Sequence, residues 1–391
     1  MKSWIEVFAA FLRLGLTAFG GPVAHLGYFH REFVERRRWL DEASWSDVVA
    51  LCQFLPGPAS SQTGILIGLA RGGYGGAAAA WLGFTLPSAA AMVAFAFAAP
   101  AISSVAGGGW VHGLKLAAVA VVAQAVLTMA RSQAPDLPRA ALAVAVAVAS
   151  LAVPSPYAPL AAILVGIGFG LALLRRGALG ERAPLRLPVG RRAGAVFLAL
   201  FLGLIVALPA AASLSGAHGL EEAARFYRVG SLVFGGGHVV LPLLQREVVD
   251  AGWASRDAFL AGYGAAQALP GPLFAIAAYL GAVMLEPPSG LAGAAICLGA
   301  IFLPSFLLVF GVAPYWEAVR RSPAAQAGLR GANAAVVGVL AAALYNPVWT
   351  GSVTRPADVA VAAGAFVALT ALRAPPWLVV VAAAVAGGLL G

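Results

Sequence analysis

Residues 11–22 read FLRLGLTAFGGP, and residues 226–237 read FYRVGSLVFGGG. When the two stretches are aligned at an offset of 215 residues, a Phe, an Arg, a Gly and the closing Phe-Gly-Gly occupy the same positions in both. Identical residues in the same order, over so short a distance, indicate that one stretch is a copy of the other. The sequence therefore predicts an internal duplication.

The similarity between the two halves continues downstream of these stretches. Glu32 aligns with Glu247 at the same offset, after which one residue is lost. Later, TLPS at 85–88 resembles FLPS at 302–305, and GLKLAAVAVV at 113–122 resembles GLRGANAAVV at 328–337. These pairs predict a first repeat at 1–175 and a second repeat at 220–391. At an offset of 214 residues, Trp39, Gln53, Pro56, Gly57 and Pro58 align with Trp253, Gln267, Pro270, Gly271 and Pro272.

The composition places the chain in a membrane. Of its 391 residues 61% are hydrophobic and only 10% are charged, and the mean hydropathy is +0.88. A soluble domain has about a quarter of its residues charged. The chain is therefore predicted to be an all-α polytopic membrane protein with about a dozen segments of ~20 residues. The same figures exclude a disordered chain, a nucleic-acid module and a disulfide scaffold. Cys52 and Cys297 lie in apolar stretches and are expected to be packing residues.

A basic connection separates the two repeats. Residues 175–192 hold six arginines and one Glu, together with Pro and Gly, which is typical of a solvated linker. A single apolar segment at about 193–211 follows it. We therefore expect residues 176–219 to form a basic cytoplasmic linker and one connecting transmembrane span.

The distribution of charge indicates that the second repeat is inverted. The segment 31–38 carries four arginines, whereas its counterpart at 246–257 has a net charge of −1. The loop 100–110 has no charge, whereas its counterpart near 315–327 has a net charge of +1. Basic residues collect in cytoplasmic loops, so a bias that changes sign between repeats predicts opposite orientations. The complete trace places the N-terminus in the cytoplasm and the C-terminus outside, with 17 basic residues inside and 4 outside.

Each repeat contains two interrupted helices. In the first repeat the interruptions are Gly20-Gly21-Pro22 and Pro56-Gly57-Pro58, and both motifs break a helix. Their counterparts lie at 235–237 and 270–272. These segments are either re-entrant hairpins or kinked helices that cross the membrane fully. Gly- and Pro-interrupted segments at matching positions of inverted repeats indicate a substrate site near the membrane midplane. Helix N-termini there would suit a small oxyanion.

Basic side chains within apolar stretches are candidates for binding that anion. A charge in a membrane segment costs about 2.5–3.5 kcal/mol, so it commonly faces a cavity or a partner. Arg13 and Arg228 precede the first break of each repeat, and they align with each other. Lys115 and Arg330 also align, close to the ends of spans, where snorkelling to the headgroups is an equal alternative.

Other polar residues are weaker candidates. Gln53 and Gln267 precede the two Pro-Gly-Pro motifs and would either hydrogen-bond the anion or take part in helix packing. Glu32 and Glu247 would either carry protons or pair with the adjacent Arg31 and Arg246, and pairing is favoured. A role in proton coupling is the lesser alternative to a structural one for His25 and His238. Asn333 has no polar counterpart, since Ala118 aligns with it.

Motifs for enzymatic chemistry are absent from the sequence. It contains no GxxxxGK[ST], HExxH or GxSxG motif, so neither direct use of ATP nor a hydrolase site is expected. No metal or organic cofactor is expected either. The chain is predicted not to be an enzyme.

The motifs as a set resemble one known family. FGGP at 19–22, Gln53 with FLPGP at 54–58, FGGG at 234–237 and QALPGP at 267–272 are similar to those of the chromate ion transporter family in its long, two-domain form. The resemblance covers nearly the whole chain. It implies a bacterial inner-membrane exporter of chromate that uses the proton motive force. It further implies that Arg13, Gln53, Phe19-Gly20-Gly21-Pro22 and Pro56-Gly57-Pro58 contribute to transport. Gly237 and His238 depart from the pattern, where the first repeat has Pro22 and Val23.

We therefore predict a secondary active transporter that exports chromate, or a related oxyanion such as sulfate, by alternating access. The partners would be that anion and the lipid bilayer, without nucleic acid. Gly-rich spans such as 164–170 allow close packing within the chain or in a homodimer. A passive anion channel and a lipid scramblase or flippase are the alternative functions, because both also use re-entrant hairpins.

Overall fold

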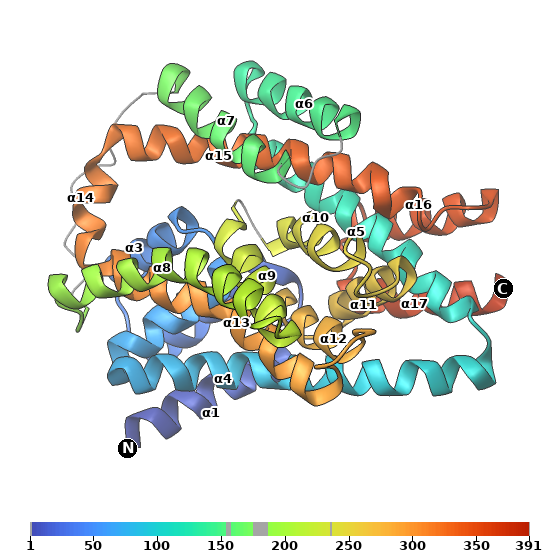
Figure 1. Cartoon of the computed structure of the whole chain (residues 1–391), viewed down its shortest axis with the longest axis horizontal. Helices are drawn as coiled ribbons and strands as arrows, with labels where there is room; N and C mark the ends of the chain where they lie inside the picture. The colour runs from blue at the N-terminus through green and yellow to red at the C-terminus, as the bar shows by residue number, and fades with distance from the viewer. Residues whose placement is uncertain (1, 154–157, 175–186, 235–236, 391) are drawn as a thin grey trace.

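A computed structural model describes residues 2–153, 158–174, 187–234 and 237–390 of the chain. Within these ranges the chain forms helices joined by short turns, and no strand is present. The long helices α4 (Ala59–Ala106), α13 (Gly290–Val312) and α15 (Pro323–Ala343) extend along the longest axis of the molecule (Figure 1). The N-terminus and the C-terminus lie at opposite ends of that axis (Figure 1).

The helices follow the order that the apolar segments predict. The first half contains α1 (Lys2–Thr17), α2 (Gly21–His30), a π-helix (Arg31–Arg36), α3 (Glu42–Phe54), α4, α5 (Gly109–Gln133), α6 (Leu137–Ala152) and α7 (Ala158–Leu173). The connecting helix α8 (Arg191–Ser215) follows. The second half contains α9 (His218–Leu232), α10 (Val240–Leu244), a π-helix (Gln245–Val249), α11 (Arg256–Ala268), α12 (Ile276–Ala282), α13, α14 (Trp316–Arg321), α15, a π-helix (Leu344–Trp349), α16 (Pro356–Thr370) and α17 (Pro376–Leu390).

Five helices in the described residues are long and apolar enough to cross a membrane. They are the segments 59–105, 109–133, 191–215, 290–321 and 323–349. Only 6% of the most apolar stretch of α8 is buried inside the protein, as expected of a helix that faces lipid. The fold is therefore that of an all-α polytopic membrane protein.

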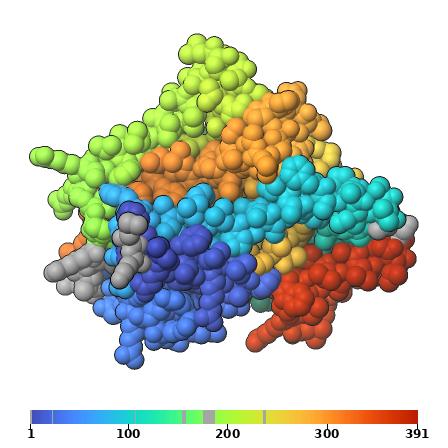
Figure 2. Space-filling view, turned by 90° about the horizontal axis from the view of Figure 1, so that it is seen from below, coloured from blue at the N-terminus to red at the C-terminus, as the bar shows by residue number. Residues whose placement is uncertain are grey.

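Helix α4 consists of two arms joined by a sharp turn. Gly72 and Gly73 have non-helical backbone angles, and Gly73 has a φ of 61°. The arms fold back on each other, since Gly68 and Gly76 are so close that a Cβ on either would strike the backbone of the other. The chain therefore reverses its direction at Gly72 and Gly73. The second arm, residues 74–106, packs along α1 (Figure 2).

The last helices of each half pack against the other half. Helix α5 contacts α16 and α17, whereas α15 contacts α6 and α7. Glycines allow these helices to approach closely: Gly331 of α15 meets Gly166 of α7, and Gly113 of α5 meets Ala383 of α17. The two halves are thus interlocked. The Gly-rich span 164–170 is used for packing inside the chain.

Candidate functional site

Three of the four predicted helix breaks lie wholly within the described residues, and for the fourth the described residues show where α9 ends. α1 ends at Thr17 and α2 begins at Gly21, while α3 ends at Phe54 and α4 begins at Ala59. In the second half, α9 ends at Leu232 and α11 ends at Ala268. Gly235 and Gly236 lie outside the described residues, and Gly237 begins a short 3-10 helix.

Each break is the tip of a hairpin. The rings of Phe11 and Phe33 stack with centroids 4.8 Å apart, so the chain after the first break returns along α1. Arg225 of α9 donates a hydrogen bond of 3.1 Å to the carbonyl of Glu247. α3 and the first arm of α4 share one apolar cluster, and the hydroxyl of Tyr279 on α12 bonds the carbonyl of Ala258 on α11 at 3.0 Å. These segments are therefore hairpins rather than kinked helices that continue in one direction.

The tips of the four hairpins meet in two reciprocal pairs. The backbone N–H of Gly57 donates to the carbonyl of Val233 at 2.6 Å, and the N–H of Gly271 donates to the carbonyl of Ala18 at 3.0 Å. Gly57 aligns with Gly271 in the sequence, and Ala18 aligns with Val233. The Pro-Gly-Pro turn of each half thus bonds the first break of the other half.

The glycines at these turns have backbone angles that other residues rarely adopt. Gly57 has a φ of 121° and Gly271 a φ of 93°, both in the left-handed region. Space is also restricted, because a Cβ on Gly57 would lie 2.9 Å from the hydroxyl of Ser305. A Cβ on Gly271 would lie 2.9 Å from the hydroxyl of Ser88. The sequence at the turns is therefore set by both backbone conformation and close contact.

A run of buried polar side chains follows the first Pro-Gly-Pro turn. Ser60, Ser61, Gln62 and Thr63 form the first turn of α4 and are at most 3% exposed. The first N–H groups of a helix have no acceptor within the helix and carry a partial positive charge. The hydroxyl of Ser61 and the Oε1 of Gln62 have no hydrogen-bond partner among the described residues. The aligned residues of the second half, 274–277, are Phe, Ala, Ile and Ala. The polar start of α4 is therefore a feature of the first half alone.

Two serines that were not among the predicted site residues lie beside the Pro-Gly-Pro turns. Ser305 on α13 is fully buried beside Gly57, and its hydroxyl has no partner. Ser88 on α4 lies beside Gly271, and its hydroxyl donates to the carbonyl of Thr85 at 3.0 Å. The signal was available, since both residues end the aligned TLPS and FLPS sequences. The sequence does not show that each serine contacts the Pro-Gly-Pro turn of the other half, because this contact depends on how the halves pack.

Both candidate histidines lie at the hairpin tips. His25 is 1% exposed, and its ring nitrogens lie 3.2 Å from the carbonyl of Ala18 and 3.3 Å from the hydroxyl of Ser60. It therefore joins the first break to the start of α4. The Nδ1 of His238 lies 3.0 Å from the hydroxyl of Tyr263. The Nε2 of His238 lies near Gly21 of the other half, at 4.0 Å from the position of a Cβ there.

The two predicted arginines lie on the outside of their helices. Arg13 is exposed and forms no ion pair with any of the described residues. Arg228 is also exposed, and its guanidinium pairs with Glu247 at 3.1 Å. The glycine two positions after each arginine explains part of the motif. Gly15 packs against the backbone of Gly83 and Phe84, and Gly230 packs against Ile301, so α1 and α9 lie tightly on their neighbouring long helices.

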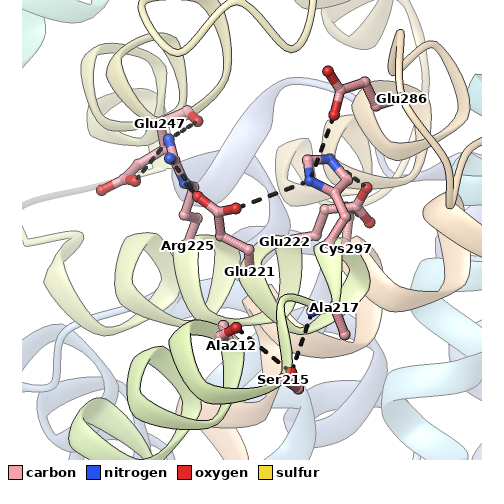
Figure 3. A network of polar contacts seen from close by, with 10 residues as sticks. Ala212, Ser215, Ala217, Glu221, Glu222, Arg225, Glu247, Glu286 and Cys297 are labelled. Atoms are coloured by element: carbon pink, nitrogen blue, oxygen red, sulfur yellow. Dashed lines mark hydrogen bonds and ion pairs between the residues drawn. The ribbon is translucent and has the colours of Figure 1, made fainter.

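Glu32 and Glu247 take part in similar ion-pair clusters at the open ends of their hairpins. The carboxylate of Glu32 accepts from Arg36 and Arg37, and Arg37 also reaches Glu6 of α1 at 3.5 Å. Glu247 pairs with Arg228 at 3.1 Å. It also pairs with Arg225, which reaches Glu221 of α9 at 2.7 Å (Figure 3). Both glutamates are therefore paired, but with other arginines than the adjacent Arg31 and Arg246 that the sequence suggests. Arg31 instead lies over the ring of Tyr28.

The other predicted residues are spread over the molecule. Gln53 is exposed, whereas the amide Nε2 of Gln267 is buried without a partner. Lys115 pairs with Asp257 at 2.9 Å. Arg330 donates to the carbonyl of Gln326, and the buried Oδ1 of Asn333 has no hydrogen-bond partner. Phe19 lies beside Trp377 of α17, and Pro22 stands in the first turn of α2.

Comparison with known proteins identifies relatives along nearly the whole chain. The family model described as chromate transporter matches residues 5–171 and again residues 220–388. The chromate transport protein of Pseudomonas aeruginosa is 29% identical, over 87% of this chain and 80% of its own length. A probable chromate transport protein of Synechococcus elongatus is 28% identical, over 85% of this chain and 82% of its own length. The chromate transport protein of Cupriavidus metallidurans is 27% identical, over 85% of this chain and 80% of its own length. No solved structure matches the chain.

Proposed function

The chain belongs to the chromate transporter family, and on that basis we propose that it exports chromate by alternating access, driven by the proton motive force. Sulfate, a tetrahedral oxyanion of the same charge, is the related substrate to be tested beside it. The membrane would be the bacterial inner membrane, with the N-terminus in the cytoplasm. The named chromate transport proteins among the relatives support the substrate.

The observation that carries the proposal is the meeting of the four hairpin tips. Irregular backbone is tolerated at membrane depth only where protein buries it or where it lines a cavity. Here the turns at Gly57 and Gly271 are held by the carbonyls of Val233 and Ala18. Two broken-helix turns joined in this way are an arrangement suited to a substrate site between two units that move relative to each other.

We assign the anion to the start of α4. Its first N–H groups have no acceptor within the helix. Among the described residues the hydroxyls of Ser61 and Ser305 have no hydrogen-bond partner, so they are further donors for the anion. The amide Nε2 of Gln267 is a further unpaired donor. The Gly-Gly-Pro and Pro-Gly-Pro turns would hold the site in shape, because the N–H groups of Gly57 and Gly271 already bond Val233 and Ala18 and proline has no N–H. Arg13 and Arg228 would attract the anion from the surface rather than hold it in the buried site.

We further propose that the halves are inverted repeats, 1–175 and 220–391, joined by 176–219. Two separate matches to one family model support this proposal, as do the reciprocal hydrogen bonds between aligned residues. In that orientation a dianion leaves a cell whose interior is negative. The potential then contributes about 2.3 kcal/mol per charge per 100 mV to export.

The substrate is tested by measuring uptake of radiolabelled chromate and sulfate into inverted membrane vesicles. We expect saturable chromate uptake that unlabelled chromate inhibits. Uptake of sulfate alone would change the substrate and leave the proposed site in place. No saturable uptake of either anion would contradict the proposed function.

A further inference from the structure

A second group of buried polar atoms lies at the beginning of α9, at the opposite end of this helix from the hairpin tip. Glu222 is fully buried between α9 and α13. Its Oε2 lies 3.9 Å from the Sγ of Cys297, and its Oε1 lies 3.6 Å from the Nε2 of His218. Within the part of the chain that the structure describes, neither Oε1 of Glu222 nor Nε2 of His218 has a hydrogen-bond partner. Two unsatisfied polar atoms therefore face each other in an enclosed place.

The charged groups around this pair leave Glu222 without a permanent cation. The other ring nitrogen of His218 lies 3.9 Å from Glu221 on α9 and 4.0 Å from Glu286 in the turn after α12 (Figure 3). Arg225 is occupied by Glu221 and Glu247 and lies over Trp253, whose ring also contacts His218. Among the described residues no lysine or arginine pairs with Glu222. The imidazole of His218 is its one ionisable partner of opposite charge.

This arrangement requires one proton on the pair. Burial of an unpaired carboxylate is very unfavourable. A carboxylate beside a neutral imidazole has a net charge of −1. One further proton gives either a carboxylic acid beside a neutral imidazole or a carboxylate beside an imidazolium, and neither form has a net charge. Removing that proton leaves an isolated buried anion. Because proton affinity then depends on whether water reaches Glu222, proton binding is linked to conformation.

We propose that His218 and Glu222 form the proton-binding site that couples proton entry to export of the anion. The inference rests on the proposed function. His218 takes a proton from water on the side of Glu221 and Glu286. It then passes the proton on its Nε2 to Oε1 of Glu222, so the ring becomes neutral again and the carboxylate becomes a carboxylic acid. The proton leaves when movement of α9 exposes Glu222 to water.

Helix α9 connects this proton site to the anion site. It begins at His218 and ends at Leu232, and the next residue, Val233, accepts the hydrogen bond from Gly57. A displacement of α9 on protonation therefore acts directly on the turn that precedes α4. The first half has no such pair, because Ser3 and Val7 align with His218 and Glu222. The proton site belongs to the second half, and the polar start of α4 belongs to the first.

The test uses the full-length protein in liposomes that contain a pH-sensitive dye. Three quantities are measured: exchange of radiolabelled chromate at equal concentration on both sides, chromate accumulation driven by a pH gradient, and the proton movement that accompanies it. With a gradient of about one pH unit, one coupled proton supports about tenfold accumulation. We expect E222Q to lose accumulation and proton movement while keeping exchange. E222D should restore part of both, and H218Q should behave as E222Q does. The control is E35Q, which removes an exposed carboxylate.

The outcomes separate this inference from the proposed function. Absence of chromate exchange in the wild type contradicts the proposed function itself. Exchange in the wild type with proton-coupled accumulation retained in E222Q or H218Q overturns only the proton site. Chromate flux without any proton movement in the wild type also overturns it. If E222Q is not monodisperse in detergent, H218Q and E222D decide the matter by the same three measurements.

Discussion

Replacement of Gly57 or Gly271 should have the clearest effect on chromate uptake. G57A and G271A place a Cβ on a backbone in the left-handed region, which costs about 1–2 kcal/mol. The added Cβ would also lie 2.9 Å from a serine hydroxyl. We expect either change to reduce chromate uptake by at least about tenfold, as about 1.4 kcal/mol corresponds to tenfold. G73A is the matched control, since Gly73 has a φ of 61° but nothing within 4 Å of its Cβ position. Uptake in G73A equal to that in G57A would contradict the role of close contact at the turn.

Ser305 and Ser88 differ in a way that predicts different kinetics. The hydroxyl of Ser305 has no partner and lies beside the polar start of α4, whereas the hydroxyl of Ser88 already bonds the carbonyl of Thr85. A lost hydrogen bond to a charged group is worth about 1.5–3 kcal/mol. S305A should therefore raise the KM for chromate by about tenfold or more, and S88A should change it little. Initial uptake rates over a range of chromate concentrations check this, and equal KM values for the two variants would contradict the asymmetric anion site.

Among the helix contacts, the packing of α15 on α7 should contribute strongly to the thermal stability of the protein. A Cβ on Gly331 would strike the backbone of Gly166, so G331A must separate the two helices. Overpacking of this kind commonly costs about 1–3 kcal/mol. We expect a clear decrease in the thermal unfolding temperature in detergent. G168A, on α7 where nothing lies within 4 Å of the Cβ position, should leave that temperature unchanged. Similar unfolding curves for both variants would show that the two halves are not interlocked through this contact.

The elements also show what the sequence could predict and what it could not. The helix breaks follow from local chemistry, because Gly and Pro interrupt helices wherever they stand. The partners of Glu32 do not, since Arg31 is adjacent in sequence but points elsewhere, while Arg36 and Arg37 lie one turn along the π-helix on the same side. The SSQT run at 60–63 has no polar counterpart in the second half, so the repeat symmetry gives no signal for it. The bond from Gly57 to Val233 depends on tertiary packing and has no local signal.

At the scale of the whole molecule, the two ends of the chain should lie on opposite sides of the membrane. This expectation rests on the arginine distribution, from which we propose a cytoplasmic N-terminus and a C-terminus outside. We expect a periplasm-dependent reporter enzyme to be active when fused after residue 391 and inactive when fused before residue 1. A fluorescent protein that matures only in the cytoplasm should give the reverse pattern. Both ends on one side would contradict the inverted arrangement of the halves.

We propose that the anion binds where the hairpin tips meet, at the start of α4. This site would be accessible first from one side of the membrane and then from the other. The most direct measurement introduces S61C into a chain in which Cys52 and Cys297 are replaced by Ala, and labels it with a membrane-impermeant thiol reagent from either side. Ser61 is 2% exposed in this conformation. We expect labelling from both sides of the membrane, slowed by chromate in a saturable manner. Labelling from one side alone, or at a rate that chromate does not change, would contradict it.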